Sequence, residues 1–273
     1  GSPNSTPRSG SANAAAFIPE LGLSALELGW VRSVRVSEKT CAAIKSAAAE
    51  NDVAISVHAP YYINLNGDEE EWPKSRKRLM DAAHYGHLSG ADYVVFHPGS
   101  YGGKGPDEVW SHVKDRLRGC VDELREAGNP IILRPETMGK QGQLGSLEDC
   151  LQIAKMIKGV EPCLDFAHLH ARPGDGSMNS RKEWLEVLDR YEQALGSTAL
   201  KNLGCHLSGI EYTDKGEKQH RVMAEADFEL EALFAALHEK SCAGRILSES
   251  PIMEEDAKLF KQTWMQISGE REA

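Results

Sequence analysis

Short apolar segments alternate with longer amphipathic segments along almost the whole chain. The apolar segments occupy residues 24–30, 53–60, 92–99, 130–137, 161–168, 201–208 and 244–251. The stretches between them carry apolar residues at i, i+3, i+4 and i+7, which is the pattern of an amphipathic helix. Strands that alternate with helices at this spacing form a parallel sheet whose crossover connections are the helices. The sequence therefore predicts an α/β fold.

Two parallel architectures fit this alternation, an open doubly wound sheet and a closed (β/α)8 TIM barrel. The visible strand segments are one fewer than the barrel requires, and residues 1–11 have the composition of a loop that should follow a strand. We therefore expect a (β/α)8 TIM barrel whose first strand precedes Gly1. No linker or low-complexity tract interrupts the chain, so residues 1–273 are expected to form a single domain.

Composition narrows the class of protein. The net charge of −10 argues against a generally basic protein that coats nucleic acid, although it leaves room for a local basic rim or a metal-lined pocket. The six cysteines form no CxxC pair, which indicates small core residues in a reducing compartment. There is no apolar run long enough to span a membrane and no signal-peptide pattern. We expect a cytoplasmic protein without a membrane partner.

Side chains that can bind metal stand at the C-terminal ends of six consecutive predicted strands. They are His58, His97, Glu136, Asp165 with His168, His206 and Glu249. The C-terminal ends of parallel barrel strands converge on one face, where the active sites of such barrels lie. Imidazole and carboxylate are ligands for zinc, and they also suit manganese or iron. Paired ions at such a site activate water and stabilise the leaving oxygen, so the pattern predicts metal-assisted hydrolysis, with phosphodiesters as the leading substrate.

Five motifs at these positions resemble those of the endonuclease IV family of apurinic/apyrimidinic-site nucleases. In chain order they are SVHAPYYINL, VVFHPGS, LDFAH, CHLSG and SESP, spread over about 190 residues. The resemblance implies a TIM barrel with a trinuclear zinc site that hydrolyses the phosphodiester 5′ to abasic sites in duplex DNA during base-excision repair. It is weaker before residue 50, where the first strand of the family is missing.

The resemblance also implies which residues bind the first and the third of these ions. His58 and His97 would bind the first ion and share Glu136 as a bridge to the second. His168 and His220 would bind the third ion.

The second ion would be completed by Asp165, His206 and Glu249. Glu249, together with Glu136, would orient the attacking water. The expected cofactor is Zn²⁺, as two or three ions, with Mn²⁺ as an alternative. The expected state of the protein is a monomer.

The third site departs from the family pattern. The family has an aspartate two residues before the last histidine, whereas this chain reads GEKQH, with Lys218 at that position. A protonated lysine has no lone pair to offer a metal. Three arrangements remain open: Glu217 or a water completes a weak site, the ammonium of Lys218 takes the charge role of the third ion, or the centre is dinuclear. We expect two tightly bound ions and a weak or absent third.

Four residues are candidate DNA contacts. Tyr61 matches the family tyrosine that holds the DNA backbone at the damage. Arg32 and Arg35 follow a predicted strand end, where the family inserts a loop that probes DNA. Lys218 lies in a segment that is locally basic within an acidic protein, as a phosphate-facing loop would require.

Two other functions compete with the nuclease. Sugar isomerases and epimerases related to xylose isomerase use a metal quartet that Glu136, Asp165, His206 and Glu249 could supply, but a single ion does not need the additional histidines. A non-catalytic DNA-lesion binder is the third alternative, and the complete ligand sets for the first two ions argue against it.

Overall fold

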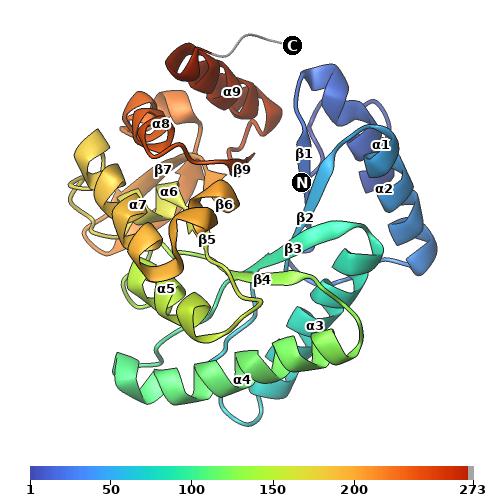
Figure 1. Ribbon diagram of the computed structural model, residues 1–273, viewed down its shortest axis with the longest axis vertical. Coiled ribbons are helices and arrows are strands. Elements are labelled where there is room, and N and C mark those ends of the chain that lie inside the picture. Colours follow the sequence, from blue (N-terminus) through green and yellow to red (C-terminus); the bar gives the residue numbers. More distant parts are fainter. Residues whose placement is uncertain (270–273) are drawn as a thin grey trace.

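Parallel strands form the wall of a barrel in the computed structural model, which describes residues 1–269, and helices surround them (Figure 1). The strands are β1 (Ala25–Gly29), β2 (Ala54–His58), β3 (Ala91–Phe96), β4 (Ile132–Pro135), β5 (Cys163–Asp165), β6 (Leu203–Leu207) and β9 (Gly244–Ser248). They pair in parallel in the orders β1-β2-β3-β4 and β5-β6-β9. Single bridges, Leu133 to Val160 and Glu136 to Cys163, connect β4 to the segment of β5. The α/β barrel expected from the sequence is confirmed.

The helices follow the strands in the predicted alternation. They are α1 (Ser11–Phe17), α2 (Glu38–Glu50), α3 (Trp72–Leu88), α4 (Pro106–Glu126), α5 (Leu147–Met156), α6 (Phe166–Ala171), α7 (Arg181–Leu195), α8 (Leu230–Glu239) and α9 (Glu254–Ser268). Three short 3₁₀ turns are η1 (Ile18–Leu21), η2 (Ser197–Lys201) and η3 (Met223–Glu225). Serine side chains cap the starts of α2 and α5, because Ser37 and Ser146 accept hydrogen bonds from backbone N–H groups that a helix leaves unpaired.

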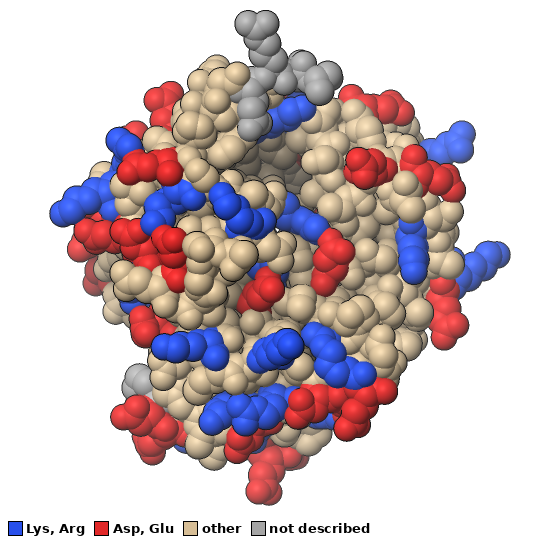
Figure 2. All heavy atoms as spheres, viewed as in Figure 1, with Lys and Arg blue, Asp and Glu red and all other residues tan. Residues whose placement is uncertain are grey.

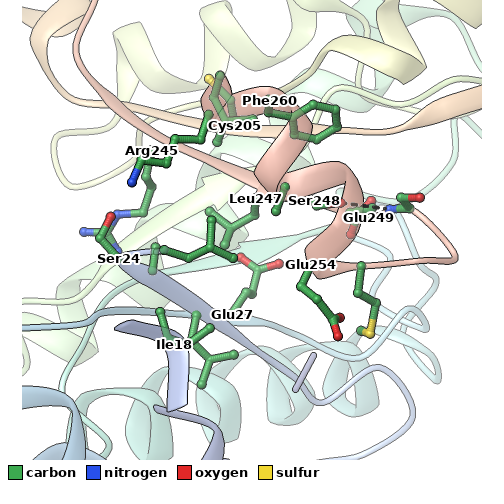
Figure 3. A pocket seen from close by; sticks show the side chains of 18 of the residues that line it. Ile18, Ser24, Glu27, Cys205, Arg245, Leu247, Ser248, Glu249, Glu254 and Phe260 are labelled. Carbon is green, nitrogen blue, oxygen red and sulfur yellow. Dashed lines mark hydrogen bonds between the residues drawn. The ribbon is translucent and has the colours of Figure 1, made fainter. Parts of the chain in front are cut away.

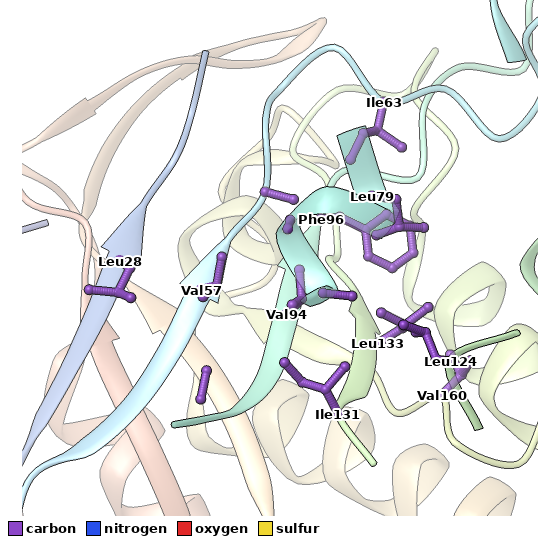
Figure 4. Close-up of a cluster of buried hydrophobic side chains, with 14 of the residues drawn as sticks. Leu28, Val57, Ile63, Leu79, Val94, Phe96, Leu124, Ile131, Leu133 and Val160 are labelled. Carbon is purple, nitrogen blue, oxygen red and sulfur yellow. The ribbon is translucent and has the colours of Figure 1, made fainter. Parts of the chain in front are cut away.

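The apolar strands are covered by the apolar faces of the helices. Val94 and Leu133 on β3 and β4 belong to a buried cluster with Leu79 of α3 and Leu124 of α4 (Figure 4). Strands buried on both faces need nearly continuous apolar sequence, which explains why β3 reads ADYVVF. Truncation of one of these leucines to alanine should cost about 2–5 kcal/mol of stability.

An antiparallel hairpin interrupts the alternation after β6. It consists of β7 (Gly209–Thr213) and β8 (Gly216–Arg221). The sequence predicts only a basic loop here. The hairpin packs on α6, and it carries His220.

Residues 161–168 are predicted as one strand, and this prediction is wrong beyond Asp165. The Asp165 side chain accepts a hydrogen bond from the N–H of His168 at 2.7 Å, so it caps α6 and the chain turns into a helix at Phe166. His168 therefore lies in the first turn of α6.

A cavity of about 930 Å³ is lined in part by residues of β1 and β9, which are end strands of the two parallel sheets in the described residues. Ile18, Leu247 and Phe260 line it, and the carboxylate of Glu27 also faces it (Figure 3). The predicted strand before Gly1 concerns residues outside this sequence and stays a prediction. Within residues 1–269, no helix has the length and apolar character that crossing a membrane requires.

Candidate metal centre

The strand ends deliver the predicted ligands to one place. His58 is the last residue of β2, His97 and Glu136 directly follow β3 and β4, and Asp165 ends β5. Ligand atoms of two groups lie within 4.8 Å of one another inside each group. The groups are His58, Glu136, His206 and Glu249, and Asp165, His168 and His220. His97 joins the first group through a contact with Glu136.

Glu136 lies at the centre of the cluster and is fully buried. Its Oε2 is 3.2 Å from Nε2 of His58 and 3.1 Å from Nε2 of His97. Its Oε1 is 3.1 Å from Nδ1 of His206. Burial opposes ionisation, but the three imidazoles hold the pKa of Glu136 well below its usual range. An ionised carboxylate whose two oxygens face different imidazoles can bridge two cations.

The tautomer of His58 is fixed by the backbone. Nδ1 of His58 lies 2.7 Å from the carbonyl oxygen of Ala59, and because a carbonyl only accepts, Nδ1 carries the proton. The lone pair of Nε2 then faces the carboxylate of Glu136. Two lone pairs at 3.2 Å need a positive charge between them, which a metal ion supplies or, in its absence, a proton. In the absence of metal, burial lowers the pKa of His58, but the charge of Glu136 raises it above its ordinary value overall.

Asp165 offers a direct test of whether the cluster suits a cation. Its Oδ1 caps α6, whereas its buried Oδ2 has no hydrogen-bond partner within residues 1–269. Burial raises the pKa of Asp165 to about 6. Nδ1 of His168 is 3.6 Å away from Oδ2, too far for a hydrogen bond. A buried carboxylate oxygen without a hydrogen bond is costly, and a divalent cation removes that cost. The residues therefore fit a metal centre.

The third predicted site is partly assembled. Nε2 of His168 lies 3.2 Å from Nε2 of His220, which comes from β8. Lys218 does not enter this site. Its ammonium pairs with Glu211 and its side chain is 56% exposed, so it does not replace a third ion.

The ion pair between Lys218 and Glu211 also weakens the prediction that the segment around Lys218 is locally basic. Glu211 also pairs with Arg221, so its carboxylate lies between the two cations of β8 and reduces their combined positive charge. A role of Lys218 in binding DNA stays a prediction.

The other candidate DNA contacts lie at the rim or beyond it. The ring of Tyr61 stacks on His97 with centroids 5.1 Å apart, and the side chain is about half exposed. A cavity of about 630 Å³ opens beside these two rings, and Lys74 and Arg78 are among the residues that line it. Arg32 and Arg35 are exposed in the segment after β1 and are not part of the cluster.

The sequence prediction missed two residues that support the centre. Glu27 on β1 places Oε1 3.0 Å from Nε2 of His206, and its Oε2 accepts a hydrogen bond from Ser56 at 2.8 Å. Thr137 accepts the N–H of Asp165 on Oγ1 at 2.8 Å, and its carbonyl lies 2.9 Å from Nδ1 of His168. A charged residue inside the apolar segment SALELGW was the available signal for Glu27.

The surface carries charges of both signs. On the face shown in Figure 2, lysine and arginine are interspersed with aspartate and glutamate, and a hollow opens in the upper part of the view. The net charge of −10 is therefore not gathered on this face.

Comparison with known proteins agrees with the sequence resemblance. A family model described as a xylose isomerase-like TIM barrel matches residues 15–265. An uncharacterized protein from Methanocaldococcus jannaschii is 33% identical over 249 residues, which cover 91% of this chain and 89% of that protein. Endonuclease 4 from Thermus thermophilus is 32% identical over 143 residues, 51% of this chain and 48% of that enzyme. A probable endonuclease 4 from Halothermothrix orenii is 27% identical over 216 residues, 74% of this chain and 75% of that protein.

Solved structures share the fold. The crystal structure of endonuclease IV from Thermus thermophilus superposes with a TM-score of 0.70 at 22% identity, covering 94% of this chain and 95% of that chain. A D-tagatose 3-epimerase-like protein superposes with a TM-score of 0.68 at 20% identity, covering 97% of this chain and 98% of that chain. At these identities the likeness establishes the fold alone. Nucleases and epimerases both have it.

Proposed function

The chain belongs to the xylose isomerase-like TIM barrel family, and we propose that it is a metal-dependent hydrolase acting on DNA. The proposed reaction is hydrolysis of the phosphodiester 5′ to an abasic site, in base-excision repair. Relatives named endonuclease 4 support this proposal, because they match over as much as three quarters of the chain.

One observation carries the proposal. His58 and His97 both direct Nε2 at the same oxygen of Glu136, at 3.2 and 3.1 Å. A sugar isomerase centre that binds one ion through Glu136, Asp165, His206 and Glu249 leaves these two histidines without a function. A centre with more than one ion uses both.

The assignment of residues to ions follows the one that the sequence resemblance implies. His58 and His97 would bind one ion, and Asp165, His206 and Glu249 another, with Glu136 bridging the two. The mixture of imidazole and carboxylate favours Zn²⁺, with Mn²⁺ as the alternative. When bound, such ions activate water and stabilise charge on the attacking and leaving oxygens of a phosphodiester.

Glu249 is the carboxylate best placed to act on water. Its side chain is 22% exposed, whereas that of Glu136 is fully buried. Burial raises the pKa of Glu249, but the neighbouring His206 lowers it below the ordinary value overall, so the group is ionised at neutral pH. We assign Glu249 to orient the attacking water and accept its proton, and Glu136 to hold the geometry with a smaller direct part in orienting water.

The substrate would approach over the rim. An abasic nucleotide leaves the duplex at low cost because no base is unstacked. Tyr61, beside His97, would contact the backbone at the damage, and Arg32, Arg35 and Lys218 would contact more distant phosphates. We further propose that the protein is a soluble cytoplasmic monomer whose partner is duplex DNA.

A sugar epimerase is the second candidate, and a lesion binder without activity is the third. The epimerase has an observation in its favour, since His206 and Glu249 lie beside Glu136 as a metal quartet would place them. In that reaction Glu136 and Glu249 would move a proton next to a carbonyl group.

The test supplies both substrates to the same preparation with Zn²⁺ or Mn²⁺. A duplex carrying one tetrahydrofuran abasic analogue is compared with its undamaged counterpart, and a ketohexose is followed for epimerisation. The proposal expects a single cut on the 5′ side of the analogue and an unchanged sugar. Epimerisation without a cut would establish the second candidate, and binding of the abasic duplex without either reaction would establish the third.

A further inference from the structure

The hairpin that carries His220 contains a β-bulge at Lys218. Across the hairpin His220 pairs with Ile210, Gln219 with Glu211 and Glu217 with Tyr212, so Lys218 is the extra residue of β8. A bulge of this kind shifts the alternation of side chains by one position. It places Glu217 on the face of His220, and it leaves Gln219 on the face of Glu211.

The contacts agree with this change of face. Glu211 pairs with Lys218, Gln219 and Arg221 on one side of the hairpin. On the other side, Oε2 of Glu217 lies 3.7 Å from Nε2 of His168. The backbone N–H of Glu217 donates to the carbonyl oxygen of Gly139 at 2.9 Å. This hydrogen bond fixes the backbone of Glu217 against the loop after β4.

That close approach depends on Gly216. Its φ is +92°, and a Cβ at this position would lie 2.2 Å from the carbonyl oxygen of Gly139. No other residue fits there without moving the backbone, so glycine fixes where Glu217 points.

His168 and His220 direct the lone pairs of their Nε2 atoms into the same space. Nδ1 of His168 lies 2.9 Å from the carbonyl of Thr137 and therefore carries the proton. Nδ1 of His220 lies 3.2 Å from the carbonyl of Glu249, which favours the same tautomer. The two Nε2 atoms are 3.2 Å apart, and ligand nitrogens about 2.0–2.1 Å from a tetrahedral zinc ion are separated by about 3.3 Å.

We infer that Glu217 joins His168 and His220 as a protein ligand of a metal site, beside Asp165, whose carboxylate also lies within 4.8 Å of both histidines. The bulge lets a glutamate three residues before His220 take the place of the family aspartate two residues before it. The inference rests on the proposed function only for the presence of metal. Because the side chain of Glu217 is 17% exposed, whereas that of Glu136 is fully buried, we expect this ion to be held less tightly than the ions that Glu136 contacts.

The test is a Zn²⁺ titration by calorimetry, with metal content per chain measured by elemental analysis after equilibrium dialysis. Glu217→Gln is compared with Glu211→Gln, which makes the same change on the opposite face of the same hairpin. Lys218→Asp restores the family residue at the bulge. Circular dichroism verifies that each variant is folded.

The inference expects a third equivalent of Zn²⁺ whose Kd rises at least about tenfold in Glu217→Gln. It expects no change of that Kd in Glu211→Gln or in Lys218→Asp, because both positions face away. An unchanged third Kd in Glu217→Gln, a tighter one in Lys218→Asp, or no third ion at all would overturn it. If no third ion binds, His168 and His220 form only a hydrogen-bonded pair. Because these readouts are independent of cleavage, failure of the proposed nuclease activity would be recognised separately.

Discussion

Glu27 and His206 contact each other inside the barrel, with Oε1 of Glu27 3.0 Å from Nε2 of His206. The opposite nitrogen of the same ring, Nδ1, lies 3.1 Å from Glu136. The imidazole is therefore held between two carboxylates from β1 and the end of β4. Burial opposes ionisation of Glu27, but the neighbouring His206 lowers its pKa to about 2, so the contact involves a carboxylate.

Replacement of Glu27 tests this relationship. A carboxylate behind a ligating histidine orients the ring and raises its basicity, so Glu27→Gln should weaken the affinity of the centre for Zn²⁺ by about 10- to 100-fold. Competition with a chromophoric chelator measures the change. Glu50→Gln, an exposed position at the end of α2, is the matched control. Equal affinities for the two variants would show that Glu27 has only a structural role.

The pH dependence of stability should differ between chelated and metal-loaded protein. In the absence of metal, burial lowers the pKa of His168, but Asp165 and Glu136 raise it from 6.5 to about 9 overall. Because the folded-state pKa exceeds the unfolded value, the stabilisation is complete below pH 6.5 and is lost as the pH rises through about 9. Bound metal replaces that proton, so the loss should disappear.

Thermal unfolding with EDTA and with Zn²⁺, followed from about pH 6 to about pH 9.5, measures both curves. Tm of the chelated protein should fall over this range, and Tm of the loaded protein should fall less. Parallel curves would contradict the assignment of His168 as a ligand.

Tyr61 should contribute to binding of substrate more than to the chemical step. Its ring stacks on His97 and remains half exposed at the rim. Tyr61→Ala should raise KM for the abasic duplex by about tenfold or more, a loss of 1.4 kcal/mol, with a smaller effect on kcat. Tyr61→Phe keeps the ring and separates the hydroxyl from the stacking. A fall in kcat alone would place Tyr61 in the chemistry instead.

Arg32 and Arg35 should act through salt-dependent binding. If each contacts a phosphate, its replacement by alanine should lower the slope of log K against log salt by about 1, without changing metal content. Fluorescence anisotropy with a labelled abasic duplex measures the slope. Lys182→Ala on α7, an exposed cation, provides the control. Unchanged slopes would assign the two arginines to solvent-exposed surface alone.

The sequence predicted the barrel and the clustering of its histidine and carboxylate side chains, because both follow periodic rules. Strand ends of a parallel barrel share one face, so the sequence alone predicts that His58, Glu136 and His206 lie close together. One oxygen of Glu136 faces two histidines at the centre of the cluster. The spacing of residues along the sequence does not determine this side-chain geometry.

The sequence did not predict the features that depart from regular strand and helix periodicity or that depend on long-range contacts. Asp165 caps a helix, so the strand expected through residue 168 ends early. The bulge at Lys218 changes which residue faces the third site, and strict alternation would have chosen the wrong one. Glu27 was missed because its partner His206 is distant in sequence, and only the folded barrel brings them into contact.

The most direct test of the central claim is incision of a duplex that carries a single abasic analogue. Three states are compared: the protein with Zn²⁺, the protein after chelation, and Glu249→Gln with Zn²⁺. Glu126→Gln, an exposed position at the end of α4, is the control variant. The account predicts a cut on the 5′ side that requires metal, survives in the control, and falls by about 10²- to 10⁴-fold in Glu249→Gln. A folded, metal-loaded protein that leaves the abasic duplex intact would contradict it.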